Sequence, residues 1–285
     1  MTKREAFWMS ALPLIRMSDE LPKIIHQTFW TGNLPSHLKD NVDRLRAMNP
    51  GWEYRFYDDS ACEHVIDEFF GEQILSIYRR VNPYYGAARA DLFRYLLMYC
   101  VGGVYLDIKS YFDRPIEQAI SKNDSFIISH WDNKAGGSYP GFGLHKELAQ
   151  WPQGELQQWH IIAAPGHPFL RRVIAKVLSN VEGYRPWRQG IGRVGVLRVT
   201  GPIAYTQAIM PLSDDLPHRR IGNNSEIGLH YSISGEYVHK DHFKNHYSLR
   251  TDPIANVPFL LRPFSRLYCF LKQRQRKLLG VAADG

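Results

Sequence analysis

The stretch GAARADLFRYLLMYCVGGVYLD, residues 86–107, constrains the fold more than any other part of this chain. Its first half is rich in alanine and places Leu92, Tyr95 and Tyr99 on one helical face. Two glycines end the predicted helix, and Val-Tyr-Leu follows as a short apolar strand. A helix that turns at glycines directly into a strand predicts an α/β unit, with Asp107 just past the end of the strand.

Similar segments occur along most of the chain. We predict strands at 22–30, 52–59, 125–130 and 159–165, and helices within 34–51, 60–80, 167–178 and 200–210. Repeated alternation of strand and helix predicts an α/β fold whose sheet is covered by helices on both faces. With 285 residues, 44% of them hydrophobic and 22% charged, the chain can bury the core of one large domain.

Cysteines and apolar runs bear on where the protein works. Cys62, Cys100 and Cys269 are scattered and match neither a disulfide framework nor a zinc site, which favours a reducing compartment. The first residues are basic and precede a short apolar run, but Ser10 and Pro13 interrupt it, and no small-residue cleavage site follows. Because no run approaches the roughly 18 apolar residues that cross a bilayer, we expect a cytoplasmic, unexported protein.

The net charge of +7 comes from the end of the chain. No acid occurs between Asp252 and Asp284, whereas six bases do: Arg262, Arg266, Lys272, Arg274, Arg276 and Lys277. Subtracting these six from 35 bases leaves 29 against 28 acids. The remainder is nearly neutral, so the chain lacks the surface-wide basic footprint of a nucleic-acid-binding protein, and we expect no nucleic acid among its partners.

The basic segment also has a helical apolar pattern. Within one arc lie Phe264, Leu267, Tyr268, Leu271 and Leu278, while Arg266, Lys272, Arg276 and Lys277 lie outside it. One interpretation is a helix on an anionic lipid surface, and the other is a helix packed against the protein's own body. We expect the former, with residues 251–285 holding the protein as a peripheral protein on the inner face of the cell membrane.

Three charged side chains stand out around the central strand. Open α/β sheets bind ligands at the carboxyl ends of their strands, where Asp107 lies. Asp91 and Arg94 are three residues apart on the preceding helix and share one of its faces. The residues alone leave two interpretations open: a ligand-binding group, or a turn residue beside a surface salt bridge.

The order PKIIHQTFW, NPGWEYRFYDD and ARADLFRYLLMYCVGGVYLD resembles the DXD-motif glycosyltransferases of the sugar-binding-region type, glycosyltransferase family 32. That grouping includes yeast α-1,6-mannosyltransferases and is similar to the glucosyltransferase domains of clostridial toxins. The resemblance is dense over residues 22–112. It implies a GT-A-like single domain with a Rossmann-like mixed sheet, a nucleoside diphosphate sugar donor and transfer with retention of configuration. We therefore expect an N-terminal extension at 1–21, a catalytic domain at 22–250 and the basic amphipathic segment at 251–285.

The resemblance also assigns expected roles in binding the donor. Asp91 and Arg94 would hold the donor sugar and its phosphate, with Arg89 on the same helix as a further substrate-binding residue. Phe29 or Trp30 would stack on the nucleobase.

Later segments are expected to complete the site. The TGP turn with Thr200 and Gly201 is similar to a family stretch near donor and acceptor, and its backbone N–H groups could bind an anion. His246, beside Asn245, is expected as a late metal ligand. Residues 131–133 and 135–143 are expected to form part of the acceptor wall.

The departure from the family is Lys109, which replaces the second acid of the Asp-x-Asp motif. Two acids normally hold Mn²⁺ or Mg²⁺ against the diphosphate, and a lysine lowers the negative charge and repels the metal. Three interpretations of this replacement are open. Asp107 could keep the metal with other ligands, Asp113 among them, or the Lys109 ammonium could contact the diphosphate itself. In the third interpretation the protein has lost transfer chemistry. We expect Asp107 and Lys109 to be catalytic, with a weaker or absent metal requirement.

Other functions fit less well. The glycines at 102–103 end a helix and form no G-x-G-x-x-G, and no G-x-S-x-G is present, which excludes the usual dinucleotide oxidoreductase and hydrolase motifs. The sequence therefore predicts a transferase that extends a glycan or lipid-linked saccharide in surface polysaccharide biosynthesis. The alternative is a nucleotide-sugar or carbohydrate-binding protein that keeps the fold without catalysis.

Overall fold

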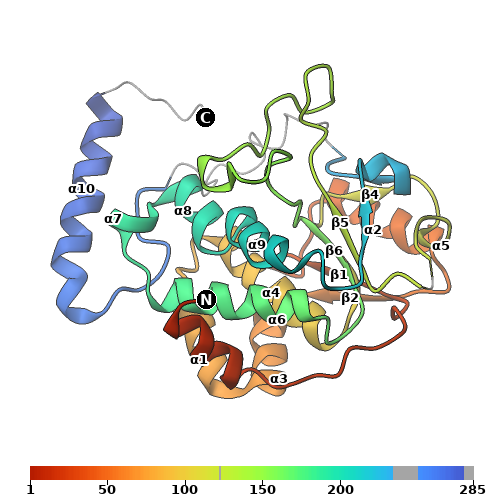
Figure 1. Cartoon of the computed structure of the whole chain (residues 1–285), viewed down its shortest axis with the longest axis horizontal. Helices are drawn as coiled ribbons and strands as arrows, with labels where there is room; N and C mark the ends of the chain where they lie inside the picture. The colour runs from red at the N-terminus through yellow and green to blue at the C-terminus, as the bar shows by residue number, and fades with distance from the viewer. Residues whose placement is uncertain (122, 234–249, 279–285) are drawn as a thin grey trace.

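A six-stranded mixed sheet forms the centre of the protein, whose computed structural model describes residues 1–121, 123–233 and 250–278 (Figure 1). The strands lie in the order β2–β1–β3–β6–β5–β7. Their bounds are β1 Ile24–Thr28, β2 Glu53–Tyr57, β3 Gly103–Leu106, β5 Phe126–Ser129, β6 His160–Ala163 and β7 Arg219–Ile221. A separate antiparallel pair joins β4, Tyr111–Phe112, to β8, Leu229–His230.

Strand directions divide the sheet into two parts. β1 pairs in parallel with both β2 and β3, whereas β6 runs antiparallel to β3 and to β5. β7 returns to a parallel pairing with β5. The predicted α/β class with a mixed sheet flanked by helices is confirmed, although β7, β4 and β8 were not predicted because they are only two or three residues long.

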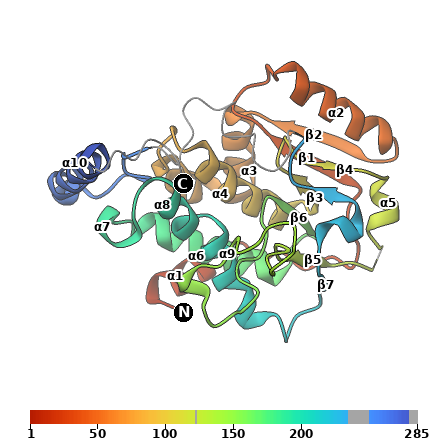
Figure 2. The ribbon, with the colours of Figure 1, turned by 90° about the horizontal axis from the view of Figure 1, so that it is seen from above.

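Helices cover both faces of the sheet (Figure 2). Their bounds are α1 Lys3–Ala11, α2 Ser36–Met48, α3 Asp59–Arg80, α4 Gly86–Cys100, α5 Ile116–Ala119, α6 Pro168–Glu182, α7 Pro186–Gln189, α8 Gly192–Val199, α9 Pro202–Ile209 and α10 Arg262–Leu278. Successive residues of β3 alternate between the two cores: Tyr105 packs with α3, α4 and α6, and Val104 and Leu106 pack on the side of α2 and α5. The helix α4 is thus buried between the sheet and α6, which explains why nearly all its side chains are covered.

The turn between α4 and β3 requires glycine. Gly102 and Gly103 have φ values of +67° and +101°, a region that side chains with a Cβ rarely adopt. A Cβ on Gly103 would lie 2.5 Å from the carbonyl oxygen of Ile24 on β1. The two glycines therefore let β3 begin immediately beside β1 and fix where its carboxyl end points.

The two ends of the chain differ in how they meet this body. The N-terminal α1 packs on α6, and the Trp8 indole, 2% exposed, donates a hydrogen bond to Glu182 (3.1 Å). Residues 254 and 255 are buried against the core, but α10 stands at the edge of the molecule in both views. Among the described residues, no helix is both long and apolar enough to cross a membrane.

Candidate active site

Asp107 directly follows β3, and its carboxylate is the partly exposed group around which the charged residues gather. The backbone leaves the extended conformation there, because the N–H of Ser110 donates to the carbonyl oxygen of Asp107 (2.8 Å) and closes a turn. The amide of Asn41 on α2 donates to the carbonyl oxygens of Ile108 and Ser110 and holds the turn from outside. Asp107 and Lys109 therefore do not sit on one face of an extended strand.

Arg94 of α4 lies under this carboxylate. Its Nη1 is 3.0 Å from Asp107 Oδ1, its Nη2 is 3.4 Å from Asp91 Oδ1, and its side chain is only 4% exposed. The guanidinium also donates to the carbonyl oxygens of Gln158 (2.8 Å) and Ala90 (3.2 Å). Since these contacts occupy most of its donors, Arg94 acts here as a fixed support for Asp107 and Asp91.

Asp91 is buried behind Arg94 and is bound from two further segments. Thr200 Oγ1 donates to Asp91 Oδ2 (2.8 Å), and Gln158 Nε2 donates to Asp91 Oδ1 (3.1 Å). The hydroxyl of Tyr95 donates to the carbonyl oxygen of Thr200 (2.9 Å) and ties the same segments together. The predicted residues Asp91, Arg94, Asp107 and Thr200 are thus brought into one hydrogen-bonded network.

Charge coupling within the network sets its electrostatics. Burial raises the pKa of Asp91, and the adjacent Arg94 and the Thr200 hydroxyl oppose that rise. Burial alone would lower the pKa of Arg94, but attraction by Asp107, and then by Tyr105 and Asp91, outweighs it and raises the pKa. The guanidinium therefore stays charged, and it lies in a site that already carries two carboxylates.

Lys109 lies over an aromatic ring. Its Nζ is 4.0 Å from the centroid of the Tyr231 ring, a cation–π contact. Burial lowers the pKa of Lys109, while the attraction of Asp107 opposes the change. The ammonium is thus a second cation beside the Asp107 carboxylate, at the end of a flexible four-carbon side chain.

A row of aromatic rings continues from Tyr231. Trp131 packs edge-on against Tyr231 at 5.3 Å between centroids, and it also packs against Tyr139 at 4.7 Å and Phe142 at 4.9 Å. We call these four rings the aromatic row. Its outer member Phe142 is 40% exposed, so the row leads from Lys109 to solvent along the loop between β5 and β6.

A buried carboxylate supports the aromatic row from behind. Glu155 Oε1 accepts a hydrogen bond from the indole Nε1 of Trp131 (2.7 Å), and Glu155 Oε2 pairs with His145 Nε2 (2.7 Å). Gly143 fits closely there, since its φ is +72° and a Cβ would lie 2.7 Å from the Glu155 side chain. Neither Glu155 nor Tyr231 was predicted from the sequence, because a single Glu or Tyr in a loop carries no pattern.

The other predicted binding residues lie elsewhere or are committed to other partners. Arg89 pairs with Glu63 Oε1 (2.7 Å) and Asp59 Oδ2 (3.7 Å) on α3. The N–H groups of Thr200 and Gly201 both donate to the carbonyl oxygen of Val196 (3.1 and 2.9 Å), so these two groups are not free to bind an anion. At this turn the Thr200 side chain, rather than the backbone, joins the network.

Of the two predicted base-stacking rings, one is available at the surface. Phe29 is half-buried against Leu38, Val42 and Ile108. Trp30 is 68% exposed, with its ring centroid 5.8 Å from that of Phe29. Trp30 is therefore the ring that could stack on a nucleobase, with Phe29 behind it.

Among the described residues, the donor set around Asp107 does not fit a divalent cation. Asp107 is a single carboxylate with a guanidinium on one side and an ammonium nearby, and Asp113 is engaged with Arg114 and His230 at 2.9 Å each. Within the part of the chain that the structure describes, no three His, Cys, Asp or Glu side chains come together as metal ligands. The predicted metal ligand His246 and its neighbour Asn245 lie outside the described residues.

Comparison with known proteins agrees with the predicted resemblance. Residues 35–127 match the model of the family described as glycosyltransferase sugar-binding region containing DXD motif. The initiation-specific α-1,6-mannosyltransferase of Candida albicans is 28% identical over 215 residues, which cover 70% of this chain and 55% of that protein. The mannosyl phosphorylinositol ceramide synthase SUR1 of Saccharomyces cerevisiae is 30% identical over 196 residues, covering 65% of this chain and 47% of that protein.

A solved structure gives a weaker likeness. The UDP-bound glycosyltransferase domain from the YGT toxin aligns over 91% of both chains with a TM-score of 0.49 and 9% sequence identity. The chain spans about half the length of the curated relatives that it matches. The matched region contains Asp91, Arg94, Asp107 and Lys109, so the resemblance to DXD-motif glycosyltransferases is confirmed over the segment that builds the network.

Proposed function

We propose that this protein is a glycosyltransferase that moves a sugar from a nucleoside diphosphate sugar to a hydroxyl of a glycan or lipid-linked saccharide. The observation that carries the proposal is the network at the end of β3, in which buried Arg94 holds Asp107 at 3.0 Å and Asp91 at 3.4 Å. The matched family region spans this network, and both curated relatives are named for mannosyl transfer. We therefore propose mannose as the transferred sugar.

Asp107 and Lys109 bind different parts of the donor in this proposal. Asp107, 26% exposed and fixed by Arg94, accepts hydrogen bonds from hydroxyls of the donor sugar. Lys109 leaves the Tyr231 ring and places its ammonium on the diphosphate. As the bond to the sugar breaks, negative charge grows on the departing diphosphate, and the ammonium of Lys109 placed against it stabilises that charge.

The lysine also accounts for the unsuitable metal site. In DXD-motif enzymes a divalent metal ion would neutralise the diphosphate. Here the ammonium of Lys109 would supply part of that positive charge. Among the described residues, one partly exposed carboxylate lies beside two cations, which is a donor set unsuited to a divalent metal. Transfer with retention of configuration follows from the resemblance and is part of the proposal.

The acceptor would bind along the aromatic row. Sugar rings present C–H faces that pack on aromatic rings, and Tyr139 and Phe142 reach the surface next to the Lys109–Tyr231 contact. Glu155 fixes the Trp131 indole, so the row is rigid where an acceptor would lie. We propose that this acceptor is a lipid-linked saccharide of surface polysaccharide biosynthesis, presented at the cytoplasmic face of a membrane.

The competing function is a binding protein without catalysis, which the replacement of an acid by Lys109 favours. Turnover separates the two. Purified protein should release GDP from GDP-mannose faster than UDP from UDP-glucose, with and without Mn²⁺, and Asp107→Asn should abolish release, whereas the exposed Asp214→Asn should retain it. Binding of GDP-mannose without release, transfer or sensitivity to Asp107→Asn would instead identify a binding protein.

A further inference from the structure

The helix α10 carries its apolar side chains on one arc and no acidic residue. Phe264, Leu267, Leu271 and Leu278 recur at intervals of three, four and seven residues, which places them on one side of the helix. The preceding short helical turn, Phe259–Leu261, adds two further apolar side chains at its base. An amphipathic helix of a globular protein ordinarily turns such an arc towards the core.

Here the apolar arc faces away from the protein. Phe264, Leu267 and Leu271 are 62%, 57% and 55% exposed, and Leu278 is 86% exposed. Phe259 and Leu260 are 75% and 81% exposed. The packing interpretation of this segment predicts these side chains to be buried, and the described structure places them on the outside.

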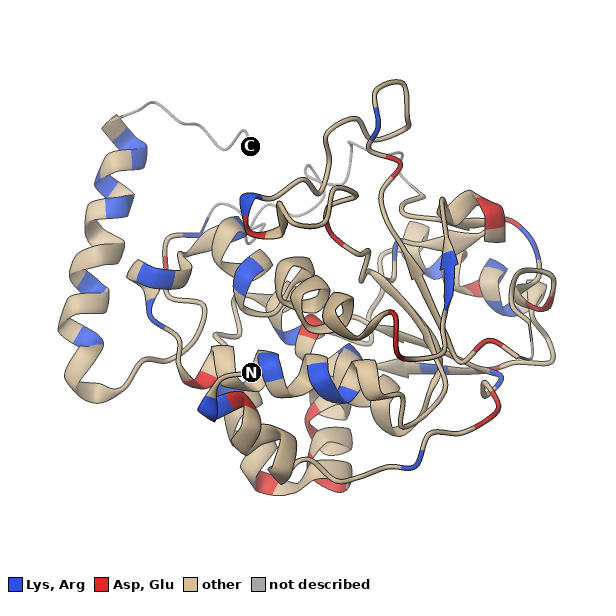
Figure 3. Cartoon of the chain, in the orientation of Figure 1, with Lys and Arg blue, Asp and Glu red and all other residues tan. Residues whose placement is uncertain are grey.

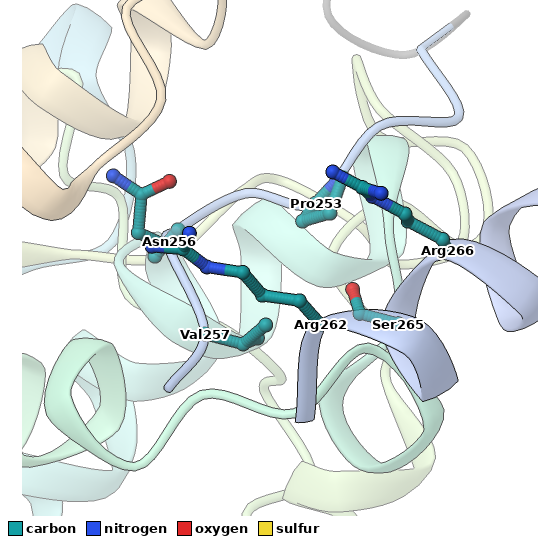
Figure 4. Close-up of a pocket in the computed structure, with 7 residues that line it drawn as sticks. Pro253, Asn256, Val257, Arg262, Ser265 and Arg266 are labelled. Atoms are coloured by element: carbon teal, nitrogen blue, oxygen red, sulfur yellow. The ribbon is translucent and has the colours of Figure 1, made fainter. Parts of the chain in front are cut away.

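The opposite, polar side of α10 meets the body. Ser265, 2% exposed, is buried, and half-buried side chains continue its stripe at Cys269, Lys272 and Arg276. Figure 4 shows Ser265, Arg262 and Arg266 facing a hollow of about 390 Å³ between α10 and the segment 253–257. The polar side of the helix therefore faces the body, and its apolar face is unpartnered among the described residues.

The charge on α10 decides between the possible occupants of this face. All six of its charged residues are basic, and Figure 3 shows blue bands along the helix with no red. A second copy docking through the same face would bring two such helices together with like charges near the contact. An anionic lipid surface instead offers hydrocarbon for the apolar arc and phosphate for Arg274 and Lys277 at its edge.

We propose that the outward face of α10, with Phe259 and Leu260, docks on an anionic phospholipid membrane. Such docking would hold the protein at the membrane, where the proposed function places the acceptor. The inference rests on the proposed function only for that location of the acceptor. The apolar side chains enter the interface between headgroups and acyl chains, and the basic side chains at the edge of the arc contact lipid phosphates. The interaction needs no membrane-spanning segment.

Co-sedimentation of the full chain with phosphatidylglycerol–phosphatidylcholine vesicles tests the proposal. The protein should bind these vesicles, bind pure phosphatidylcholine much more weakly, and dissociate at about 0.5 M salt because screening weakens the phosphate contacts. Leu267→Ser/Leu271→Ser should weaken binding at least tenfold. Arg274→Gln/Lys277→Gln should weaken it about 30-fold, since each base near the surface contributes about fivefold.

Matched variants elsewhere on the surface provide the controls. Leu14→Ser/Leu144→Ser removes two exposed leucines from other segments, and Lys3→Gln/Lys146→Gln removes two exposed charges. Both should bind vesicles like the parent protein. The proposal is wrong if the α10 variants bind vesicles as well as these controls do. It is also wrong if the parent protein does not bind vesicles and instead forms a dimer that Leu267→Ser/Leu271→Ser abolishes.

Release of nucleoside diphosphate from a soluble donor separates this inference from the proposed function. The α10 variants lie outside the Asp107 network and should release the product at the parent rate. Loss of vesicle binding with unchanged release supports the docking surface. Unchanged vesicle binding in the α10 variants would refute it and leave the proposed function standing, whereas absent donor turnover in every variant would count against the function alone.

Discussion

The Nη1 of Arg94 lies 3.0 Å from Oδ1 of Asp107, although the arginine side chain is 4% exposed and the aspartate 26%. The pair thus connects the interior of α4 to the surface at the end of β3. Because Arg94 also binds Asp91 and two carbonyl oxygens, it cannot move towards a ligand without breaking several contacts. In the part of the chain that the structure describes, Lys109 forms a cation–π contact with Tyr231, and it is the cation that we propose to contact the diphosphate.

Substitution of Lys109 should reveal its role in place of a metal. Lys109→Ala should lower donor turnover at least tenfold, since the departing diphosphate loses its cation. Lys109→Asp places a second acid two residues after Asp107, and its turnover should become dependent on added Mn²⁺, whereas parent turnover should resist EDTA. Steady-state rates with and without metal measure both effects, and full activity of Lys109→Ala would exclude the proposed contact.

Thr200 should matter through its hydroxyl. Thr200→Val removes the donor to Asp91 (2.8 Å) while keeping the side-chain shape, so we expect a loss of about 1–3 kcal/mol in unfolding free energy and weaker donor binding. Thr200→Ser keeps the hydroxyl and should restore both. Urea unfolding and donor titration measure the two quantities, and equal stability of the Val and Ser variants would contradict the role of this hydrogen bond.

The turn between α4 and β3 should not tolerate a side chain. Gly103→Ala combines φ of +101° with a Cβ 2.5 Å from the Ile24 carbonyl oxygen, and we expect it to cost more than about 2 kcal/mol. Gly86→Ala is the matched control, because no atom lies within 4 Å of the new methyl group and the site is helical. Chemical denaturation of both variants checks the difference, which would vanish if the turn could relax.

Buried histidines should make the protein sensitive to acid. Burial lowers the pKa of His160 to about 3 and that of His26 to about 4, whereas an unfolded histidine titrates near 6.5. Between about pH 4 and 6.5 the unfolded chain binds protons that the folded chain does not. The free energy of unfolding should therefore fall as pH is lowered from 6.5 towards 4, by up to about 1.4 kcal/mol per pH unit per histidine.

A variant isolates the contribution of one ring. His160→Asn should reduce the slope of unfolding free energy against pH by about one proton in this window, whatever its effect on stability at neutral pH. Equal slopes for the parent protein and His160→Asn would show that His160 is not held neutral.

The aromatic row should affect the acceptor and not the donor. Phe142→Ala removes the exposed outer ring, and we expect a higher KM for a methyl α-mannoside acceptor with unchanged release of nucleoside diphosphate in its absence. The exposed Phe69→Ala on α3 is the matched control and should change neither quantity. A parallel loss of donor release in Phe142→Ala would place the ring at the donor instead.

Local pattern determined much of the architecture. Helical and strand periods predicted α4, β3 and most of the alternating elements, because the period of apolar side chains is fixed by backbone geometry within a few residues. The same short range placed Asp91 and Arg94 on one helical face, and the family resemblance added Asp107 to this group. The two-residue β4 and β8 carry no such period and exist only as partners of each other.

Contacts between distant segments were decided by the tertiary structure. Thr200 reaches Asp91 across 109 residues, Lys109 lies over Tyr231, and Arg89 turns to Glu63 although it shares a helix with Arg94. Pattern predicted that α10 is amphipathic and left two interpretations for its apolar side, packing on the body or facing outward, and the structure has it facing outward. The partners of a side chain depend on which segments pack beside it in the folded protein. That packing is determined by the whole chain, and the sequence of one short segment does not specify it.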